Sequence, residues 1–165
     1  MRHVLIALTM FTSISTPAET VFFAGRIAQA DVPTGYEHNF EDKRRTLVLL
    51  PISQKKMEIR FTANSLREYV KQRPMIGRDI VQDAASKKGK EAFQIAENGG
   101  IAFIDFTESR VINGENTQST HGMMGLNDVY VTFTVTVADE ISGSEAVRTM
   151  LATGIKSLLG RIKSH

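Results

Sequence analysis

The sequence predicts an α+β protein: an antiparallel sheet of about five to six strands, covered by a long C-terminal helix and one or two shorter helices. Apolar and polar residues alternate from Asp128 to Ala138, which predicts a strand with one wholly apolar face. Apolar residues recur at helical spacing from Val147 to Ile162. Most strand-like segments follow one another with no helix between them, which favours an antiparallel meander over alternating βαβ units.

The first half of the chain predicts three strands. Val21 to Gly25 is a short strand candidate, and the Pro33 and Gly35 pair within Val32 to Tyr36 predicts a turn after it. Thr46 to Leu50 is a continuous apolar run, and Met57 to Phe61 alternates with period two. The polar residues between these two segments predict a turn that joins them.

Two helices are expected in the middle of the chain. Ser65-Leu66-Arg67-Glu68 has the spacing of a capping box, in which the serine and the glutamate each bond a free backbone N–H. It predicts a helix that buries Leu66, Tyr69 and Val70 and ends before Pro74. Arg78 to Ala85 predicts a second, short helix.

Two further strands, Glu91 to Ala96 and Ile101 to Phe106, are expected on either side of the turn Asn98-Gly99-Gly100. After Val111 to Gly114 the chain enters a polar stretch, Glu115 to Asn127. We expect this stretch to be a long hairpin loop or a mobile flap, and therefore the first place to look for function.

A second capping box, Ser142-Gly143-Ser144-Glu145, opens the C-terminal helix. Lys156, Arg161 and Lys163 near its end suit the negative pole of the helix dipole. We expect this helix to lie across the sheet.

The N-terminus has the pattern of a secretory signal. Arg2 and His3 precede an apolar run from Val4 to Phe11, and small residues end the segment at Ala18. Cleavage there leaves residues 19–165 as a single domain, although Ala28-Gln29-Ala30 leaves a site as late as Ala30 open. With no cysteine to acylate and no later apolar stretch long enough to span a bilayer, we expect a periplasmic or secreted protein with no stable membrane anchor.

Composition argues against two features, a nucleic-acid partner and stabilisation by disulfides. The chain has 20 basic and 18 acidic residues, and losing Arg2 with the signal leaves 19 against 18. This near balance, without basic clusters interleaved with aromatic residues, argues against a nucleic-acid partner. No cysteine is present, so no disulfide stabilises the fold and apolar burial must do so.

The order of these segments resembles that of the PsbP-like and DcrB-like family of small α+β proteins, many of which are exported. The likeness rests on Val32-Pro33-x-Gly35-Tyr36, Leu47 to Leu50, Ile59-x-Phe61, Ser65-Leu66 and Lys156-Ser157-Leu158. Two departures are Tyr36, where the family often has tryptophan, and the Glu115 to Asn127 stretch, which has no counterpart there. The resemblance implies a binding, assembly or accessory role and assigns no binding residue.

We therefore expect a non-enzymatic, exported domain that binds another protein, either periplasmic or incoming, with no cofactor and no catalytic residue. An immunity protein that blocks a toxin or hydrolase is one form of this role. The oligomeric state stays open. The hypothetical binding loop contains Glu115, Ser119, His121, Met123, Met124, Leu126 and Asp128.

The alternative is a small-molecule or metal-binding protein, or a hydrolase, that uses Ser119 to Asp128. A hydrolase would need His121 as base, Ser119 as nucleophile and Asp128 to orient the imidazole, but a base two residues from its nucleophile in a loop has no enforced geometry. Soft ligands for Cu(I) would be His121 with the adjacent methionines, and Met57 or His38 would have to complete the set. No metal is expected, because the chain has no repeated metal-ligand spacing.

Overall fold

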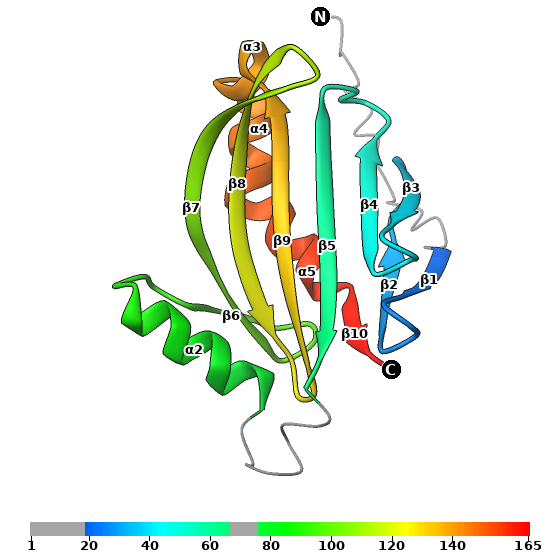
Figure 1. The fold of residues 1–165 in the computed structure, drawn as a ribbon, viewed down its shortest axis with the longest axis vertical. Helices are drawn as coiled ribbons and strands as arrows, with labels where there is room; N and C mark the ends of the chain where they lie inside the picture. The colour runs from blue at the N-terminus through cyan, green and yellow to red at the C-terminus, as the bar shows by residue number, and fades with distance from the viewer. Residues whose placement is uncertain (1–18, 67–75) are drawn as a thin grey trace, which may run out of the picture.

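A computed structural model describes residues 19–66 and 76–165, which form two antiparallel sheets and three helices (Figure 1). The predicted α+β class and the covering C-terminal helix are confirmed. The strands are more numerous than expected, since one sheet has seven strands and a second has three. The helix predicted after Ser65 falls mainly on residues outside the described ranges. Leu66, the last described residue before them, is buried.

The large sheet has the strand order β3-β4-β5-β9-β8-β7-β6. Its strands are β3 (Tyr36–Glu41), β4 (Thr46–Pro51), β5 (Met57–Ser65), β6 (Phe93–Ile95), β7 (Gly100–Ile112), β8 (Glu115–Gly125) and β9 (Val129–Ala138). All neighbours pair antiparallel, and consecutive strands are joined by hairpins except where β9 lies beside β5. The turn predicted around Pro33 and Gly35 is present immediately before β3.

The prediction that Glu115 to Asn127 forms a long loop is wrong, because Glu115–Gly125 form β8. This strand lies between β7 and β9 and pairs with both along its length. Pairing on both sides satisfies its backbone groups and outweighs the weak strand propensity of its glycines and polar residues. His38, considered above as a possible additional copper ligand, lies in β3.

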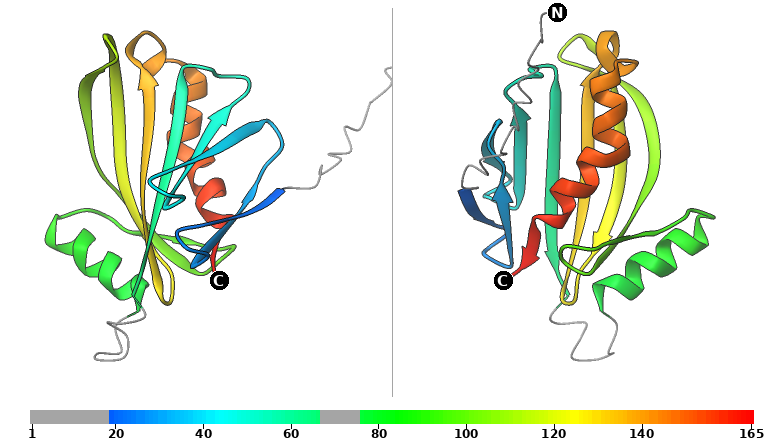
Figure 2. Two further views of the ribbon diagram at one scale, coloured as in Figure 1. Left: turned by 45° about the vertical axis from the view of Figure 1, so that its right-hand side comes forward. Right: turned by 180° about the vertical axis from the view of Figure 1, so that it is seen from behind.

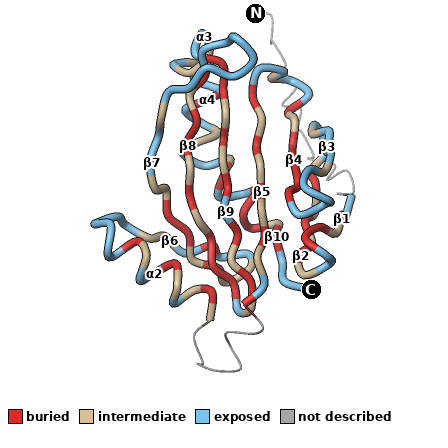
Figure 3. Tube along the Cα trace, viewed as in Figure 1, coloured by how far each residue is buried: buried red, intermediate tan, exposed pale blue. Residues whose placement is uncertain are grey.

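The alternating residues of β9 separate the two faces of the large sheet. Val131, Phe133 and Val135 are buried on one face, where they join one continuous core with the C-terminal helix (Figure 3). The threonines between them point to the opposite face. The sheet is therefore covered along one face and open over much of the other.

The C-terminal helix crosses behind the large sheet, as Figure 2 shows. After a short turn of helix, α3 (Asp139–Ser142), it runs through α4 (Glu145–Thr149), a π-helical segment, η1 (Met150–Gly154), and α5 (Ile155–Gly160). Its capping residue is Ser144, whose hydroxyl accepts the N–H of Val147 at 3.3 Å, rather than Ser142 as the capping box predicted. Val147, Ile155 and Leu158 bury the predicted apolar stripe.

Ile162 was predicted to continue this helix, but it begins strand β10 (Ile162–Ser164). This strand completes the second sheet, whose order is β1-β2-β10, with β1 (Glu19–Phe23) and β2 (Ala28–Val32). Asp31 in β2 connects all three strands: its carboxylate accepts from the Thr20 hydroxyl and from the Lys163 ammonium, each at 2.8 Å. The two ends of the described chain are therefore held in one sheet.

The second predicted helix is confirmed as α2 (Gly77–Lys87), which packs on β7 and β8 from the side opposite the C-terminal helix (Figure 2). Val81 and Ala85 of α2 pack against Phe103 of β7, and all three side chains are buried. At its first residue, Gly77 approaches Gly125 so closely that a Cβ on either glycine would overlap the backbone of the neighbouring element. Two glycines thus set the distance between α2 and the end of β8.

Gly125→Ala should lower the free energy of unfolding by roughly 1–3 kcal/mol, because the added methyl group must push the backbone of Gly77 away. Chemical denaturation measures this change. The matched control is Gly143→Ala, at a glycine with an ordinary φ of −85° and no heavy atom near its would-be Cβ. Equal effects of the two substitutions would contradict the close contact.

Asp31→Asn tests the carboxylate that connects the small sheet. Hydrogen bonds from Lys163 and Thr20 lower the pKa of Asp31, so the charged form stabilises the folded state. At pH 7 the variant should lose roughly 0.5–1 kcal/mol, as is usual for a partly exposed pair. The difference from the parent protein should be complete above about pH 5 and disappear as the pH falls through the lowered pKa, in denaturation curves recorded at each pH. A difference that grows in acid would contradict this assignment.

Candidate functional site

The uncovered part of the large sheet carries two cross-strand rows of side chains, which we call the open face. The pairing register aligns Arg60, Thr134, His121 and Phe106 in one row across β5, β9, β8 and β7. The next row contains Glu58, Thr136, Ser119 and Glu108. The row below them, toward α2, is closed by the packing of Phe103 and Met123 against that helix.

His121 lies at the centre of the open face and is fixed on three sides. Its Nδ1 is 3.1 Å from the Thr134 hydroxyl, and its Nε2 is 2.9 Å from Oε1 of Glu108. The Phe106 ring stacks on the imidazole, with centroids 4.5 Å apart and planes inclined by 22°. The ring therefore has a defined orientation in a paired strand, whereas the sequence predicted that His121 lies in a long loop or a mobile flap.

Glu108 is shared between two cations or potential cations on the same face. Besides His121, its Oε1 lies 2.6 Å from the Arg110 guanidinium. Neither this oxygen nor Nε2 of His121 is reached by solvent, and neither makes a hydrogen bond of good geometry. The carboxylate and the imidazole are in contact beneath the surface of the face.

Arg60 organises the other side of the open face. Its guanidinium hydrogen-bonds both carboxylate oxygens of Glu41, at 3.1 and 3.2 Å, and also pairs with Glu58. Burial opposes the charged form of Arg60, but the hydrogen bond to Glu41 and the two nearby carboxylates outweigh it and raise the pKa of Arg60. Burial raises the pKa of Glu58, while the charge of Arg60 acts in the opposite direction.

The residues predicted to form a binding loop are distributed over both faces of β8. Ser119, His121 and Met123 share the side of the open face, whereas Met124 is fully buried in the core. Leu126 is also buried. Glu115 begins β8, and Asp128 lies in the turn after its other end. They do not form a flexible loop with methionines at its tip.

The arrangements needed by the alternative functions are also not assembled as predicted. Ser119 bonds Thr136 at 3.1 Å, and the carboxylate beside His121 is that of Glu108, not Asp128. Met123 and Met124 point to opposite faces of the sheet. Across residues 19–66 and 76–165, no group of three or more His, Cys, Asp or Glu side chains is placed to hold a metal ion.

The outer half of β7 carries exposed apolar residues. Phe106, Val111 and Ile112 are 47%, 68% and 38% exposed, and they are three of the four large apolar side chains found exposed in the described ranges. We call these three residues the hairpin surface. They lie along the β7–β8 hairpin, which extends past the main body of the sheet in Figure 1.

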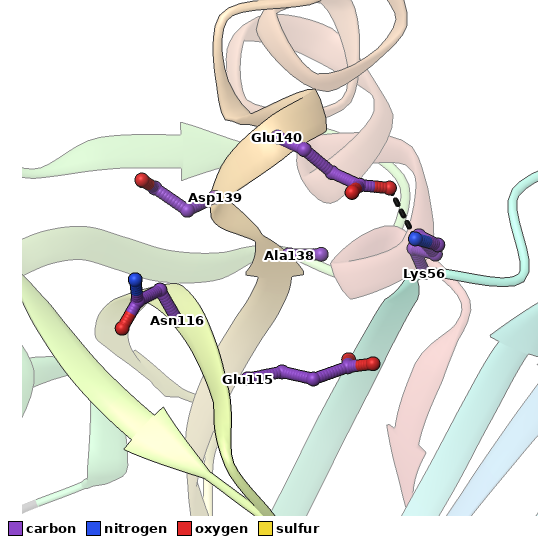
Figure 4. A pocket seen from close by; sticks show the side chains of 6 residues that line it. All are labelled: Lys56, Glu115, Asn116, Ala138, Asp139 and Glu140. Atoms are coloured by element: carbon purple, nitrogen blue, oxygen red, sulfur yellow. Dashed lines mark hydrogen bonds and ion pairs between the residues drawn. The ribbon is translucent and has the colours of Figure 1, made fainter.

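Two hollows adjoin this hairpin. One, of about 530 Å³, is lined by Ile112 together with residues of β4, β5 and β9, including Leu50, Arg60 and Thr136. The other, of about 360 Å³, lies between the start of β8 and α3 (Figure 4). There Lys56 pairs with Glu140, and the side chain of Glu115 extends below them. An apolar tip flanked by polar hollows is the composition of a protein-binding patch.

Glu108, Phe106 and Val111 were not predicted as functional residues from the sequence. A signal for them was present in Asn113-Gly114, a pair typical of two-residue hairpin turns, and both residues have positive φ, at 51° and 83°. A two-residue turn at this position aligns Ile112 with Glu115 and so brings Phe106 opposite His121.

No protein-family model matches the chain, and no curated protein is significantly similar to it in sequence. Solved structures do share its fold. A crystal structure from Bacteroides thetaiotaomicron matches 91% of this chain with a TM-score of 0.55 at 11% identity. The chain spans about half of that protein, 49% of its length.

The solution structure of the cyanobacterial PsbP protein (CyanoP) from Synechocystis sp. PCC 6803 is more distantly similar. It matches 97% of this chain and 99% of its own, with a TM-score of 0.39 at 8% identity. This is a weak resemblance in the arrangement of elements. Within the described residues, no helix has the length and apolar character required to cross a membrane.

Proposed function

We propose that this chain is an exported, non-enzymatic domain that binds another protein through the hairpin surface and the hollows beside it. The observation that carries the proposal is the exposure of Phe106, Val111 and Ile112 on one strand, with Phe106 and Ile112 on the open face and Val111 beside Ile112 on the other face of β7. Val111 and Ile112 are neighbours at the tip of the hairpin, and exposed apolar groups that adjoin one another among polar residues are characteristic of interaction sites. The charged rim is provided by residues such as Lys56, Glu115 and Glu140.

The shape of this surface favours an inhibitory or accessory role. A hairpin that extends past a rigid sheet can enter a cleft of a partner, as an immunity protein must do to block a toxin or hydrolase. The β7–β8 turn needs no side-chain support, because Asn113 and Gly114 adopt its positive φ values readily. The proposed partner is a periplasmic or incoming protein. On the basis of the sequence pattern, we also propose a distant relationship to DcrB-like proteins.

The second candidate function is chemistry at His121. Its support is the alignment of the Thr134 hydroxyl, the imidazole and the Glu108 carboxylate, which is the order of groups in a hydrolytic triad. The stacked Phe106 ring argues against it, because it restricts the approach of a substrate to the imidazole nitrogen that faces Thr134. We therefore rank it below protein binding.

Val111→Asp and Ile112→Asp should each weaken binding to the partner about tenfold or more, because a carboxylate would be desolvated in an apolar contact. The partner is to be identified first by crosslinking and mass spectrometry, and its affinity is then measured by calorimetry. The matched control is Ala152→Asp, which places the same charge at an exposed position of the C-terminal helix behind the sheet.

In the same assay, His121→Ala separates the two candidate functions. Protein binding through the hairpin surface predicts that the affinity for the partner changes little. Chemistry at the imidazole predicts complete loss of function. If His121→Ala abolishes function while both aspartate variants remain active, the proposed function is wrong.

We also propose cleavage after Ala18, which would make Glu19 the first residue of the mature chain. Support comes from the small sheet, because cleavage after Ala30 would remove β1 and divide β2. Mass spectrometry of the protein purified from an exporting host should give the mass of residues 19–165. A mass corresponding to residues 31–165 would refute the assignment.

A further inference from the structure

A third hollow, of about 530 Å³, lies between the two sheets and is lined by residues far in sequence from the hairpin surface. It is bounded by β1, an edge strand of the small sheet, and by β3, an edge strand of the large one (Figure 1). We call it the edge cleft. Its walls combine a backbone edge, two aromatic rings and two arginines. Nothing in the proposed function uses it.

The backbone of β1 faces this cleft with polar groups that pair with no strand among the described residues. The carbonyl of Phe22 accepts from the Arg44 side chain at 3.4 Å, and the N–H of Ala24 donates to the Arg44 carbonyl at 2.6 Å. These contacts identify the edge of β1 that points away from β2. Because alternate residues of a strand direct their backbone groups to the same edge, the N–H and C=O of Thr20 also face the cleft.

Two arginines flank this edge without a carboxylate partner. The guanidinium of Arg44 stacks on the Phe40 ring with 3.8 Å from its central carbon to the centroid, and that of Arg26 lies 4.8 Å from the centroid of Phe22. In the described part of the chain, neither guanidinium is within ion-pair distance of an acidic group. A guanidinium stacked by its face keeps its in-plane N–H groups available for a carboxylate.

The other charged groups of the cleft leave its balance positive. Glu19 is its acidic residue, and it lies 3.8 Å from His38 on the opposite wall. Arg45, the neighbour of Arg44, points elsewhere and donates to Asn64 at 3.4 Å. The cleft thus offers two cations and a strand edge within one hollow.

We propose that the edge cleft binds an extended acidic segment of a partner protein, which adds as a strand to the free edge of β1 and places its carboxylates against Arg26 and Arg44. Strand addition provides main-chain hydrogen bonds, and the arginines provide selectivity for acidic side chains. Charge complementarity and the unpaired backbone together favour a peptide over a small anion, which would use the arginines alone.

The test is a titration of the purified, ¹⁵N-labelled protein, as processed by the cell, with a six-residue peptide of alternating Glu and Val. We expect shifts in the amide signals of Thr20, Phe22, Arg26 and Arg44, and weaker binding as salt concentration rises. Three further probes are the corresponding Lys and Val peptide, the acidic peptide with alternate backbone nitrogens methylated, and inorganic phosphate. All three should leave the β1 signals unshifted.

Arg44→Gln should weaken binding of the acidic peptide about tenfold, through the loss of a charge-assisted contact. Arg45→Gln removes the same charge from the same turn and should leave the affinity unchanged. If Arg44→Gln disturbs signals throughout the spectrum, Arg26→Gln replaces it, with the same expectation.

Several outcomes would overturn the proposal. The basic peptide could bind as well as the acidic one, or the methylated peptide or phosphate could produce the same shifts, which would indicate charge binding without strand addition. Shifts confined to Phe106, Val111 and Ile112, or no shifts at all, would also refute it. Since the hairpin surface is tested by its own variants, failure here leaves the proposed function standing, and the reverse holds too.

Discussion

The alternation of side chains along β9 is the constraint on which the rest of the structure depends. Its valines and Phe133 form the surface that the C-terminal helix covers, so they determine where that helix lies. Its threonines form the middle of the open face, so they determine which residues of β5 and β8 become neighbours. A shift of one residue in either pairing would exchange the two faces, bury hydroxyl groups under the helix and expose the core.

How much of the fold can be predicted from the sequence depends on how visible each pattern is locally. β9 and the C-terminal helix carry a clear period, and both were predicted. β8 has no such period, since Glu115–Gly125 mixes polar residues, glycines and methionines. It is a strand because β7 and β9 pair with it, which is a tertiary cause that a local reading misses. Likewise, Ile162 fits a helical stripe but is drawn into β10 by its pairing with Ala30.

The candidate site was predictable only in part, for a related reason. His121 was singled out by its residue type, but its partner Glu108 belongs to the preceding strand and approaches only once the β7–β8 register is known. That register was available from Asn113-Gly114, had the dipeptide been read as a hairpin turn. The edge cleft is harder to foresee, because Phe22 lies in the small sheet and Arg44 in the β3–β4 turn of the large one, and no local pattern relates them.

The small sheet has a consequence for the order in which the protein folds. Asp31 and Lys163 are 132 positions apart, and β2 pairs with β10 as well as with β1. In a chain that appears with its N-terminus first, β2 therefore lacks its second neighbour, β10, until the last residues are available. Contacts of such large sequence separation form slowly, and an unpaired strand edge promotes association between chains. Completion of the small sheet should thus be the late, rate-limiting step of folding, and chains lacking their final residues should be the ones that aggregate.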